Sequence, residues 1–203
     1  AVRQRNGGLR RGILETDSAW RNQLAEAGEL LTAHRARMAE QLSKRLVVLA
    51  ASLSGDLADI SVQFRRGWDR SLNLAEALER NGQRDAEHGF TQVGPHRADL
   101  RVMAGNVLAA DILSRGQMKL LLVALKLVQG RLIEESGPTQ PLYLIDDLPS
   151  ELDAANCASV CKELGVNRQV ILTAVDRGAL ETAWHAGPLS LFHVEQGRVA
   201  LHQ

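Results

Sequence analysis

Two short stretches of the sequence carry side chains suited to phosphate chemistry. The first, residues 114–117, reads Ser-Arg-Gly-Gln and stands directly before the apolar run 118–125. A serine before such a run predicts a helix N-cap, and the free N–H groups of a helix N-terminus suit an anion. Gly116 lets a backbone or a phosphate come close, because it has no side chain. This stretch therefore predicts an anion-binding helix end.

The second stretch, residues 141–147, reads Pro-Leu-Tyr-Leu-Ile-Asp-Asp. A continuous apolar run of this kind favours a strand buried on both faces of a parallel sheet, and acids at its carboxyl end would lie where α/β sheets bind ligands. Asp146 and Asp147, buried side by side, need a cation or a proton to be tolerated. Mg²⁺ on a nucleotide explains such a pair most simply. Asp153 then stands where it can cap the next helix.

The elements that position these residues mix helices with strands. Periodicity and turn residues predict helices over 18–53, 72–80, 114–135, 154–163 and 176–184, and strands over 60–64, 90–103 (two strands and a turn), 107–112, 168–173 and 190–201 (a hairpin). The first of these helices would be roughly 50 Å long if it were continuous, so a helical hairpin or a short antiparallel arm is expected there. The helix over 114–135 is apolar nearly all round, and we expect it to be buried.

The composition limits the kinds of partner. Lys+Arg 24 and Asp+Glu 24 cancel, so any DNA contact must come from a local patch rather than from a bulk basic field. An aromatic content of 3% leaves little for stacking unpaired bases. Cys157 and Cys161 are expected to fill the core rather than to bind a metal, which suits a reducing cytoplasm. No signal peptide and no apolar run of about 18 residues is present, so secretion and membrane spanning are not expected.

Local clusters of charge offer candidate contacts for DNA or a partner. Residues 1–12 hold four arginines and no acid, which predicts either a phosphate contact or a solvated helix face. Arg65 and Arg66 stand beside Trp68; the pair could grip DNA phosphates, or the tryptophan could pack while the arginines stay solvated. Residues 94–100 read Gly-Pro-His-Arg-Ala-Asp-Leu, and Gly-Pro predicts a defined turn. No nucleophile accompanies His96, so a hydrolytic triad is not supported.

The phosphate-binding loop motif G-x-x-x-x-G-K-[ST] occurs nowhere in the sequence, and the first residue is not Met. Both observations predict that the sequence is the C-terminal part of a larger protein. On its own, such a part should not hydrolyse ATP.

Several motifs together resemble one family. Residues 113–117 (Leu-Ser-Arg-Gly-Gln) resemble the signature of ABC-type ATPases, residues 142–147 resemble their Walker B strand, and residues 150–153 (Ser-Glu-Leu-Asp) resemble their D-loop. The arginine in the signature, the Asp-Asp pair and the turn 94–100 are similar to the RecF family of bacterial recombination mediators. The resemblance implies an α/β fold: the C-terminal lobe of an ABC/SMC-like P-loop ATPase head plus a mostly helical arm.

The resemblance also implies domains and residue roles. The arm, coiled-coil-like, would span residues 1–57, a connection with a strand and a helix 58–92, and the head lobe 93–203. ATP and Mg²⁺ are the implied cofactors. For the nucleotide site, the resemblance implies nucleotide binding in trans by Ser114, Arg115, Gly116 and Gln117, Mg²⁺ binding by Asp146 and catalysis by Asp147. It places Ser150, Glu151 and Asp153 in the D-loop, and it makes Thr173 a possible phosphate sensor in place of a missing switch histidine. It also implies an interface or a nucleotide or DNA contact for His96, Arg97, Arg65 and Arg66.

By this resemblance the function is that of an ATP-gated dimer. Such a homodimer forms on ATP binding, binds double-stranded or gapped DNA in the cytoplasm, and works with other recombination mediator proteins to load recombinase during repair and replication restart. Asp147 is one methylene shorter than the usual Glu, so slow hydrolysis is expected. Two alternatives remain: a nucleotide-binding subunit of another ABC-type ATPase, such as a transporter, and a fragment that acts only as a binding or dimerisation module.

Overall fold

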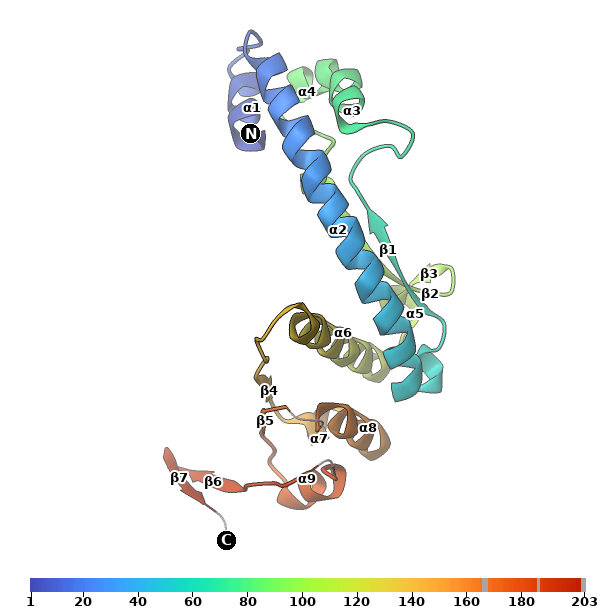
Figure 1. The fold of residues 1–203 in the computed structure, drawn as a ribbon, viewed down its shortest axis with the longest axis vertical. Helices are drawn as coiled ribbons and strands as arrows, with labels where there is room; N and C mark the ends of the chain where they lie inside the picture. Colours follow the sequence, from blue (N-terminus) through green and yellow to red (C-terminus); the bar gives the residue numbers. More distant parts are fainter. Residues whose placement is uncertain (166–167, 186, 202–203) are drawn as a thin grey trace. The chain divides into compact units, whose positions relative to one another are not determined.

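A computed structural model of the chain describes residues 1–165, 168–185 and 187–201 (Figure 1). These residues form two compact units, the first made of residues 1–48 and 59–112 and the second of residues 49–58 and 113–203. The elements of the first unit are α1 (Val2–Arg10), most of α2 (Asp17–Leu53), β1 (Ile60–Arg65), α3 (Leu74–Arg80), α4 (Gly82–His88), the 3₁₀ turn η2 (Pro95–Arg97), β2 (Asp99–Ala104), β3 (Val107–Leu108) and α5 (Ala109–Ile112).

The second unit is built around a small parallel sheet. Its elements are the end of α2, the 3₁₀ turn η1 (Gly55–Leu57), α6 (Arg115–Ser136), β4 (Tyr143–Ile145), α7 (Leu148–Glu151), α8 (Ala154–Leu164), β5 (Val170–Leu172), α9 (Arg177–Ala183), β6 (Phe192–Glu195) and β7 (Arg198–Leu201). Strands β4 and β5 pair in parallel, and β6 pairs with β7 in an antiparallel hairpin. No described helix is both long and apolar enough to span a bilayer.

Helix α2 is a single uninterrupted helix of 37 residues. The predicted helical hairpin is therefore wrong, because the segment contains neither a proline nor a turn sequence that would reverse the chain. Its one internal glycine, Gly28, is buried where a Cβ would meet the side chains of Leu74 and Pro95. The glycine thus serves close packing within the first unit and does not interrupt the helix.

The core of the first unit joins α2 to α3 and to the loop that follows β1. Its buried members are Leu24, Ala25, Trp68, Leu74, Ala77 and Leu78. Asn73 and Glu76 form a capping box at the start of α3, which satisfies two backbone N–H groups there. The helix predicted over 72–80 is therefore confirmed, with its first turn shortened to the capped boundary.

The antiparallel sheet β1-β2-β3 carries a polar face. Arg65 pairs with Asp99 and Gln63 pairs with Arg101, and directly opposite residues share a face of an antiparallel sheet. The strand predicted over 60–64 is confirmed, and a turn after Ala104 leads from β2 into β3.

Two other strand predictions in this unit are wrong. The first strand of 90–103 is absent: the backbone N–H of Thr91 is bonded to Asn6 Oδ1, that of Gln92 to Asp85 Oδ1, and Pro95 has no N–H to offer a strand ladder. Side chains thus replace a neighbouring strand as partners of this backbone. The strand predicted over 107–112 is only two residues long before helix α5 begins.

The parallel pair in the second unit is apolar on both faces but is covered on one. Tyr143 and Ile145 are half-buried, whereas Leu144 is 70% exposed and its cross-strand neighbour Ile171 is 50% exposed. A Cβ on Gly130 of α6 would overlap the Tyr143 hydroxyl, so helix and strand approach closely on the covered face. The predicted burial on both faces is therefore wrong for this chain. An apolar run allows a strand to be buried on both faces, but only one face of this strand is covered here.

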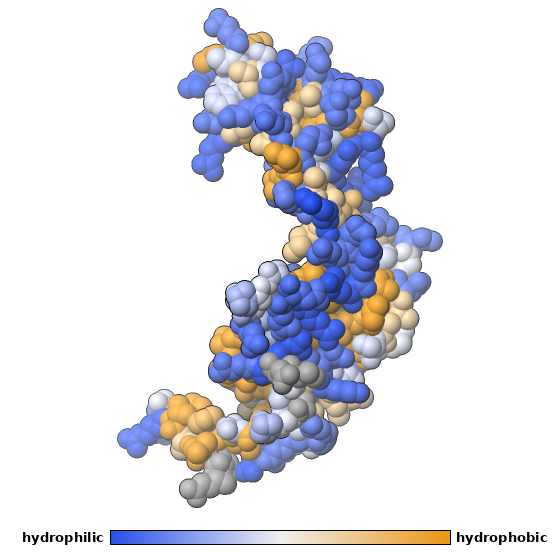
Figure 2. Space-filling view, in the orientation of Figure 1, coloured by the Kyte–Doolittle hydropathy of each residue, from blue (hydrophilic) through white to orange (hydrophobic). Residues whose placement is uncertain are grey.

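Helix α6 shows the same pattern. Its inner side is buried, but Leu122 is 52% exposed and Ile133 is 46% exposed, so the expectation that the whole helix is buried is wrong. The hairpin β6–β7 was predicted and is confirmed, yet every one of its strand residues is exposed. Figure 2 shows apolar, orange surface over this hairpin, and its large, apolar and exposed residues include Phe192 and Val194. The second unit therefore presents unpartnered apolar surface.

A bidentate ion pair fastens the end of α6 to the segment that leads into β5. The Arg168 guanidinium donates from Nε and Nη2 to the two carboxylate oxygens of Glu134, at 2.7 and 2.9 Å, and from Nη1 to the Glu163 carbonyl at 2.7 Å. Hydrogen bonding to Arg168 lowers the pKa of Glu134 from its ordinary value. Such charge-assisted, forked bonds fix the orientation of both partners.

Both cysteines are free and buried in α8, which confirms the predicted core filling. Burial raises the pKa of the Cys161 thiol to about 12. Because the thiolate is the reactive form, we expect iodoacetamide at pH 8 to modify the folded protein about a thousandfold more slowly at Cys161 than an exposed thiol. Peptide mass spectrometry measures this, with the urea-unfolded protein as the control. Equal rates in the folded and unfolded protein would contradict the burial.

The same thiol makes stability depend on alkaline pH. The pKa of Cys161 in the folded protein lies above its ordinary value. Its contribution to the free energy of unfolding is therefore complete below about pH 9, where the thiol of the unfolded chain begins to ionise. The contribution is lost progressively as the pH rises toward the folded value of about 12. Urea titrations at rising pH should show this loss, and a Cys161→Ala variant should show less of it.

Candidate functional site

The N-terminus of α6 has the predicted cap and is open to solvent. Ser114 Oγ accepts the backbone N–H of Gln117 at 3.3 Å, and the Gln117 side-chain oxygen accepts the backbone N–H of Ser114 at 2.9 Å. Gln117 Nε2 also donates to Asp56 Oδ2 at 3.0 Å, which fixes the amide group. Ser114, Arg115 and Gly116 are exposed, and apart from its own helix backbone and chain neighbours no atom lies within 4 Å of where a Cβ on Gly116 would be. The helix end therefore has room for a ligand.

The two acids stand at the carboxyl end of β4, as predicted. Thr173 follows the neighbouring strand β5, and its Oγ1 donates to Asp146 Oδ1 while accepting the backbone N–H of Asp147 at 3.0 Å. Asp146 is exposed, so the expectation of two buried carboxylates is wrong for it: the sheet end has no covering segment in this chain. Thr173, the candidate phosphate sensor, thus lies in direct contact with both acids.

Asp147 has two features typical of a functional site. Its φ is +47°, in the left-handed region, which a non-glycine residue adopts at a cost of roughly 1–3 kcal/mol. Its Oδ1 is buried and has no hydrogen-bond partner among the described residues. A buried, unsatisfied carboxylate oxygen needs a cation or a donor. An added donor or cation could satisfy this oxygen, which lacks a partner among the described residues.

The acids fit a Mg²⁺ ion that is bound together with phosphate oxygens. In the part of the chain that the structure describes, no group of three or more His, Cys, Asp or Glu side chains could hold a metal by itself. Mg²⁺ is usually held by one or two carboxylates plus waters and substrate phosphates, so two adjacent acids are a sufficient protein contribution.

The D-loop residues have distinct local roles. Ser150 is exposed, and its backbone N–H donates to the Asp147 carbonyl at 3.1 Å. Glu151 forms an ion pair with Lys119 in the second turn of α6. Asp153 caps α8 by accepting the backbone N–H of Asn156 at 2.9 Å, and this bond lowers its pKa, so that prediction is confirmed. The D-loop is therefore linked both to the acids and to the signature helix.

The signature and the acids are not in direct contact. Within the described ranges, no hydrogen bond or ion pair joins residues 114–117 to Asp146 or Asp147. Two half-sites that point to open space are what a site completed by a second subunit requires. Sequence reasoning missed Asp56 and Lys119, which hold the signature amide and the D-loop, because nothing local marks either residue.

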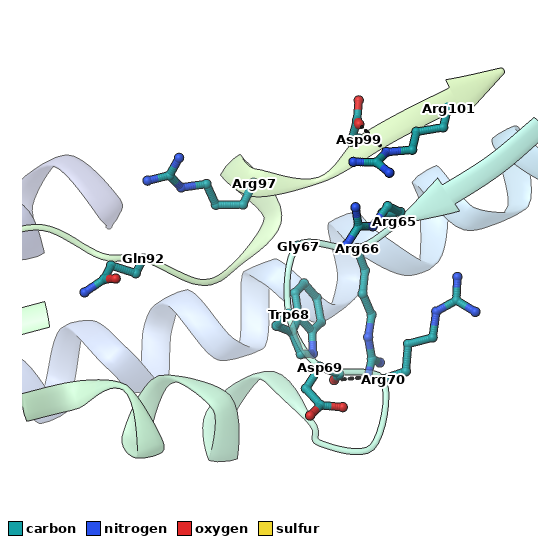
Figure 3. Close-up of a pocket in the computed structure, with 10 residues that line it drawn as sticks. All are labelled: Arg65, Arg66, Gly67, Trp68, Asp69, Arg70, Gln92, Arg97, Asp99 and Arg101. Atoms are coloured by element: carbon teal, nitrogen blue, oxygen red, sulfur yellow. Dashed lines mark hydrogen bonds and ion pairs between the residues drawn. The ribbon is translucent and has the colours of Figure 1, made fainter. Parts of the chain in front are cut away.

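The first unit contains a second candidate site, a pocket of about 650 Å³ lined mainly by arginines (Figure 3). Its lining residues are Arg65, Arg66, Gly67, Trp68, Asp69, Arg70, Gln92, Arg97, Asp99 and Arg101. The structure thus brings together the predicted Arg65, Arg66 and Arg97. His96 is exposed and is not among the lining residues; its Nε2 donates to the Thr91 carbonyl at 3.0 Å and so braces the loop.

Arg70 and Arg101 line this pocket but were missed from the sequence. The position of Arg101 could have been found, because it lies on the same face of the sheet as Arg65 once β1 and β2 are paired. Arg70 lies in an irregular loop and carries no periodic signal. The loop that follows β1 and the loop that precedes β2 meet closely at Gly67. Its φ is +92°, and a Cβ there would overlap the Gly94 carbonyl.

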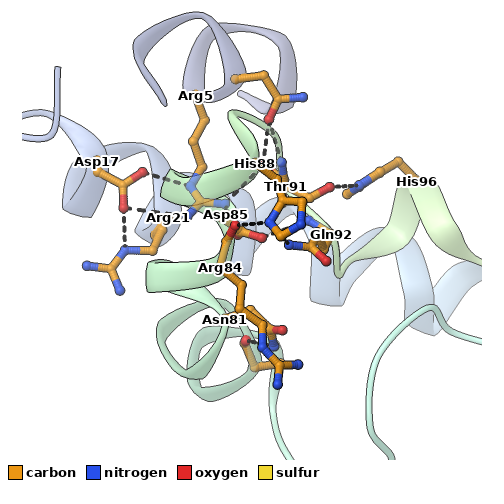
Figure 4. A network of polar contacts seen from close by, with 12 residues as sticks. Arg5, Asp17, Arg21, Asn81, Arg84, Asp85, His88, Thr91, Gln92 and His96 are labelled. Carbon is orange, nitrogen blue, oxygen red and sulfur yellow. Dashed lines mark hydrogen bonds and ion pairs between the residues drawn. The ribbon is translucent and has the colours of Figure 1, made fainter. Parts of the chain in front are cut away.

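A buried polar network lies behind the loop of residues 91–97 (Figure 4). Arg5 Nη1 donates to Asp85 Oδ2 at 2.6 Å and to Thr91 Oγ1 at 2.9 Å, and Arg5 Nε donates to Asp17 Oδ1 at 2.8 Å. The side chains of Arg5 and Asp85 are both 0% exposed. The interpretations of Arg5 as a phosphate contact or as part of a solvated face are therefore wrong, since its guanidinium is paired with buried Asp85 and partly buried Asp17.

The second unit, with its capped signature helix, parallel strands and paired acids, defines the class as an ABC/SMC-like ATPase head lobe. No protein-family model matches the chain. It is 40% identical over 203 residues to the DNA replication and repair protein RecF of Stutzerimonas stutzeri and 42% identical to that of Pseudomonas fluorescens SBW25, in each case over 98% of this chain and 55% of the relative. The chain therefore belongs to the RecF family over the region that it spans, about half the length of these relatives.

Solved structures support the fold. The chain resembles the recombination mediator protein RecF bound to ATP with a TM-score of 0.75 and 21% identity, covering 100% of this chain and 56% of that one. It also resembles an SMC head bound to the C-terminal winged-helix domain of ScpA, with a TM-score of 0.50 and 17% identity, over 82% of this chain and 43% of that one. At these identities the likeness concerns the fold, and it confirms the α/β fold class.

Proposed function

We propose that this chain provides the signature, Walker B and D-loop part of an ATP-gated, DNA-binding ATPase that acts in recombinational repair. One observation carries the proposal: a capped, solvent-open helix end and an adjacent pair of acids, of which Asp147 has a strained backbone, occupy the same compact unit with no hydrogen bond or ion pair between them among the described residues. Relatives named as DNA replication and repair proteins, and a neighbouring structure with bound ATP, support the nucleotide and the setting.

In this proposal the helix end acts on a second subunit. Ser114 and Gly116 leave the N-terminus of α6 accessible, and its free N–H groups and dipole favour the γ-phosphate. Arg115 is exposed and adds a cation beside the phosphate. Gln117 is oriented by Ser114 and Asp56, and its side chain also contacts the γ-phosphate. These four residues complete a nucleotide site whose other parts lie on the partner.

The acids supply the chemistry of hydrolysis. Asp146 holds Mg²⁺, directly or through water, and the ion would neutralise phosphate charge when it is bound. Asp147 orients or deprotonates the attacking water through its unsatisfied Oδ1. Thr173 holds both acids and is placed to respond to a phosphate there. Because Asp147 has a short side chain, slow turnover is expected.

The exposed apolar faces have a place in the same proposal. Leu144 and Ile171 form an uncovered cross-strand pair, and two-stranded parallel sheets are not stable when one apolar face meets water. We infer that this face packs against the phosphate-binding-loop part of the same protein. Residues 1–57 then act as the arm, 58–92 as its connection and 93–203 as the head lobe. Without that loop the chain alone should neither bind ATP tightly nor hydrolyse it.

At the level of the cell, the proposal is a cytoplasmic homodimer that closes on double-stranded or gapped DNA when ATP binds, and that helps other mediator proteins load recombinase. The relatives favour this function over a transporter subunit. Light scattering of the protein as encoded in its genome should show dimers with ATP and monomers with ADP. The protein should bind duplex DNA only when ATP is present. A monomer under all nucleotide conditions, or DNA binding that ignores ATP, would count against it.

A further inference from the structure

The arginine-lined pocket of the first unit has an excess of positive charge that the chain itself does not neutralise. Five arginines and two aspartates line it. Asp69 is engaged by the backbone N–H and the hydroxyl of Ser71, at 2.9 and 2.8 Å, and Asp99 is engaged by Arg101 at 3.2 Å. Both carboxylates therefore already have partners.

Of the five guanidinium groups, only that of Arg101 forms an ion pair in the described structure, and Arg66 donates to backbone carbonyls. The Arg65 side chain has no hydrogen bond or ion pair there, the Arg70 side chain reaches only the Phe64 carbonyl at 3.5 Å, and the Arg97 guanidinium lies over the Phe90 ring at 5.9 Å. Converging cations repel one another and raise the local concentration of anions. Guanidinium forks match phosphate oxygens bidentately. The pocket is thus organised for a phosphate ligand.

Arg66 has a different role from the other arginines. Its Nη2 donates to the Asp69 and Leu72 carbonyls at 2.6 and 2.8 Å, and its guanidinium lies 4.9 Å from the centroid of the Trp68 ring. It therefore holds the loop of residues 66–72 in shape. Trp68 itself is buried beneath it, at 8% exposure. Arg66 is a positioning residue through its Nη2 group, and its Nε is buried without a partner among the described residues.

The two aromatic rings near the pocket already have partners. Trp68 is buried under Arg66, and the half-buried Phe90 ring lies against the Arg97 guanidinium. Single-stranded nucleic acid is bound largely by stacking bases on free rings, whereas duplex DNA presents phosphates outward with its bases already stacked. Beyond the pocket, Gln63 continues the polar face of β1 beside Arg101. An elongated polyanion can use this row, and a single phosphate cannot.

The pocket is also held in shape before any ligand binds. The Gly94 N–H donates to the Gly67 carbonyl at 3.1 Å, which ties its two loops together. Gln92, which lines the pocket, is fixed by buried Asp85 through its backbone N–H at 2.9 Å. Pre-formed sites lose less freedom on binding.

We propose that this pocket is a site for the phosphate backbone of duplex DNA, bound without regard to sequence by Arg65, Arg70 and Arg97 and positioned by Arg66, Gly67 and Asp85. The inference rests on the proposed DNA-binding function, and it adds the surface and the form of DNA. It assigns Arg70 to the site and removes Arg66 and His96 from direct contact.

The test measures binding of a fluorescent duplex by the protein as encoded, with ATP, over a range of salt concentrations. Arg65→Gln and Arg97→Gln should each weaken binding about three- to tenfold and lower the slope of log affinity against log salt by about one. Arg84→Gln, an exposed arginine on α4, removes the same charge outside the pocket and should change affinity less than about twofold. Two duplexes of unrelated sequence should lose affinity equally.

The outcomes separate the pocket from the function. Wild-type affinity and slope in both pocket variants, with ATP-dependent binding retained, would overturn the pocket and leave the proposed function intact. Stronger competition by single-stranded DNA of equal length, or loss of binding to an acidic or phosphorylated protein with duplex binding unchanged, would also overturn it. No duplex binding by the wild-type protein that binds ATP would remove both.

Discussion

Replacing Asp85 with alanine is expected to lower the free energy of unfolding of the protein by about 3 kcal/mol, toward the low end of the range for a broken buried ion pair. The side chains of Asp85 and Arg5 are 0% exposed, and their atoms Oδ2 and Nη1 lie 2.6 Å apart. The variant leaves the Arg5 guanidinium buried with only Asp17 to compensate it. It also removes the acceptor of the Gln92 N–H.

Urea titration followed by tryptophan fluorescence measures this effect, because Trp68 lies in the core of the same unit. Glu79→Ala on α3 is the matched control: it removes an exposed acid, and we expect a change within about 0.5 kcal/mol. The double variant Arg5→Met/Asp85→Leu should recover part of the loss, since it leaves no unpaired buried charge. Equal stability of Asp85→Ala and Glu79→Ala would show that the pair contributes nothing net.

The sequence predicted best those features that depend on neighbours along the chain. Ser114 and Asp153 each cap the helix that follows them, because a cap needs only a backbone N–H two or three residues away. The apolar runs before Asp146 and Thr173 also became paired strands, as their composition indicated. The half-sites for phosphate chemistry were therefore readable in outline.

Features that depend on distant residues were not readable. Arg5 stands in a basic segment and looked solvated, yet its partner Asp85 is 80 residues away. The exposure of Leu144 follows from what covers the sheet, which an apolar run does not report. Arg70 enters the pocket only because its loop folds back, whereas Arg101 could have been placed once strand register was known.

The second large effect concerns the signature and the acids, which we expect to work across two subunits. Asp147→Asn should lower ATP turnover about 10²–10³-fold with ATP binding retained, since the amide cannot accept a proton from water. Ser114→Arg should lower it comparably, because a bulky cation fills the open helix end and blocks its cap. Ser18→Arg, at an exposed serine of α2, is the control for the same substitution outside the site.

Mixing the two inactive variants distinguishes sites completed in trans from sites within one subunit. In a mixed dimer, the Ser114→Arg subunit keeps its acids and the Asp147→Asn subunit keeps its signature, so one of the two sites is intact. An equal mixture should therefore regain about a quarter of wild-type turnover, because half of the dimers are mixed and each has one working site of two. If both groups acted within one chain, every subunit would carry a defect and the mixture would stay inactive. Since no contact joins residues 114–117 to Asp146 or Asp147 among the described residues, we expect recovery.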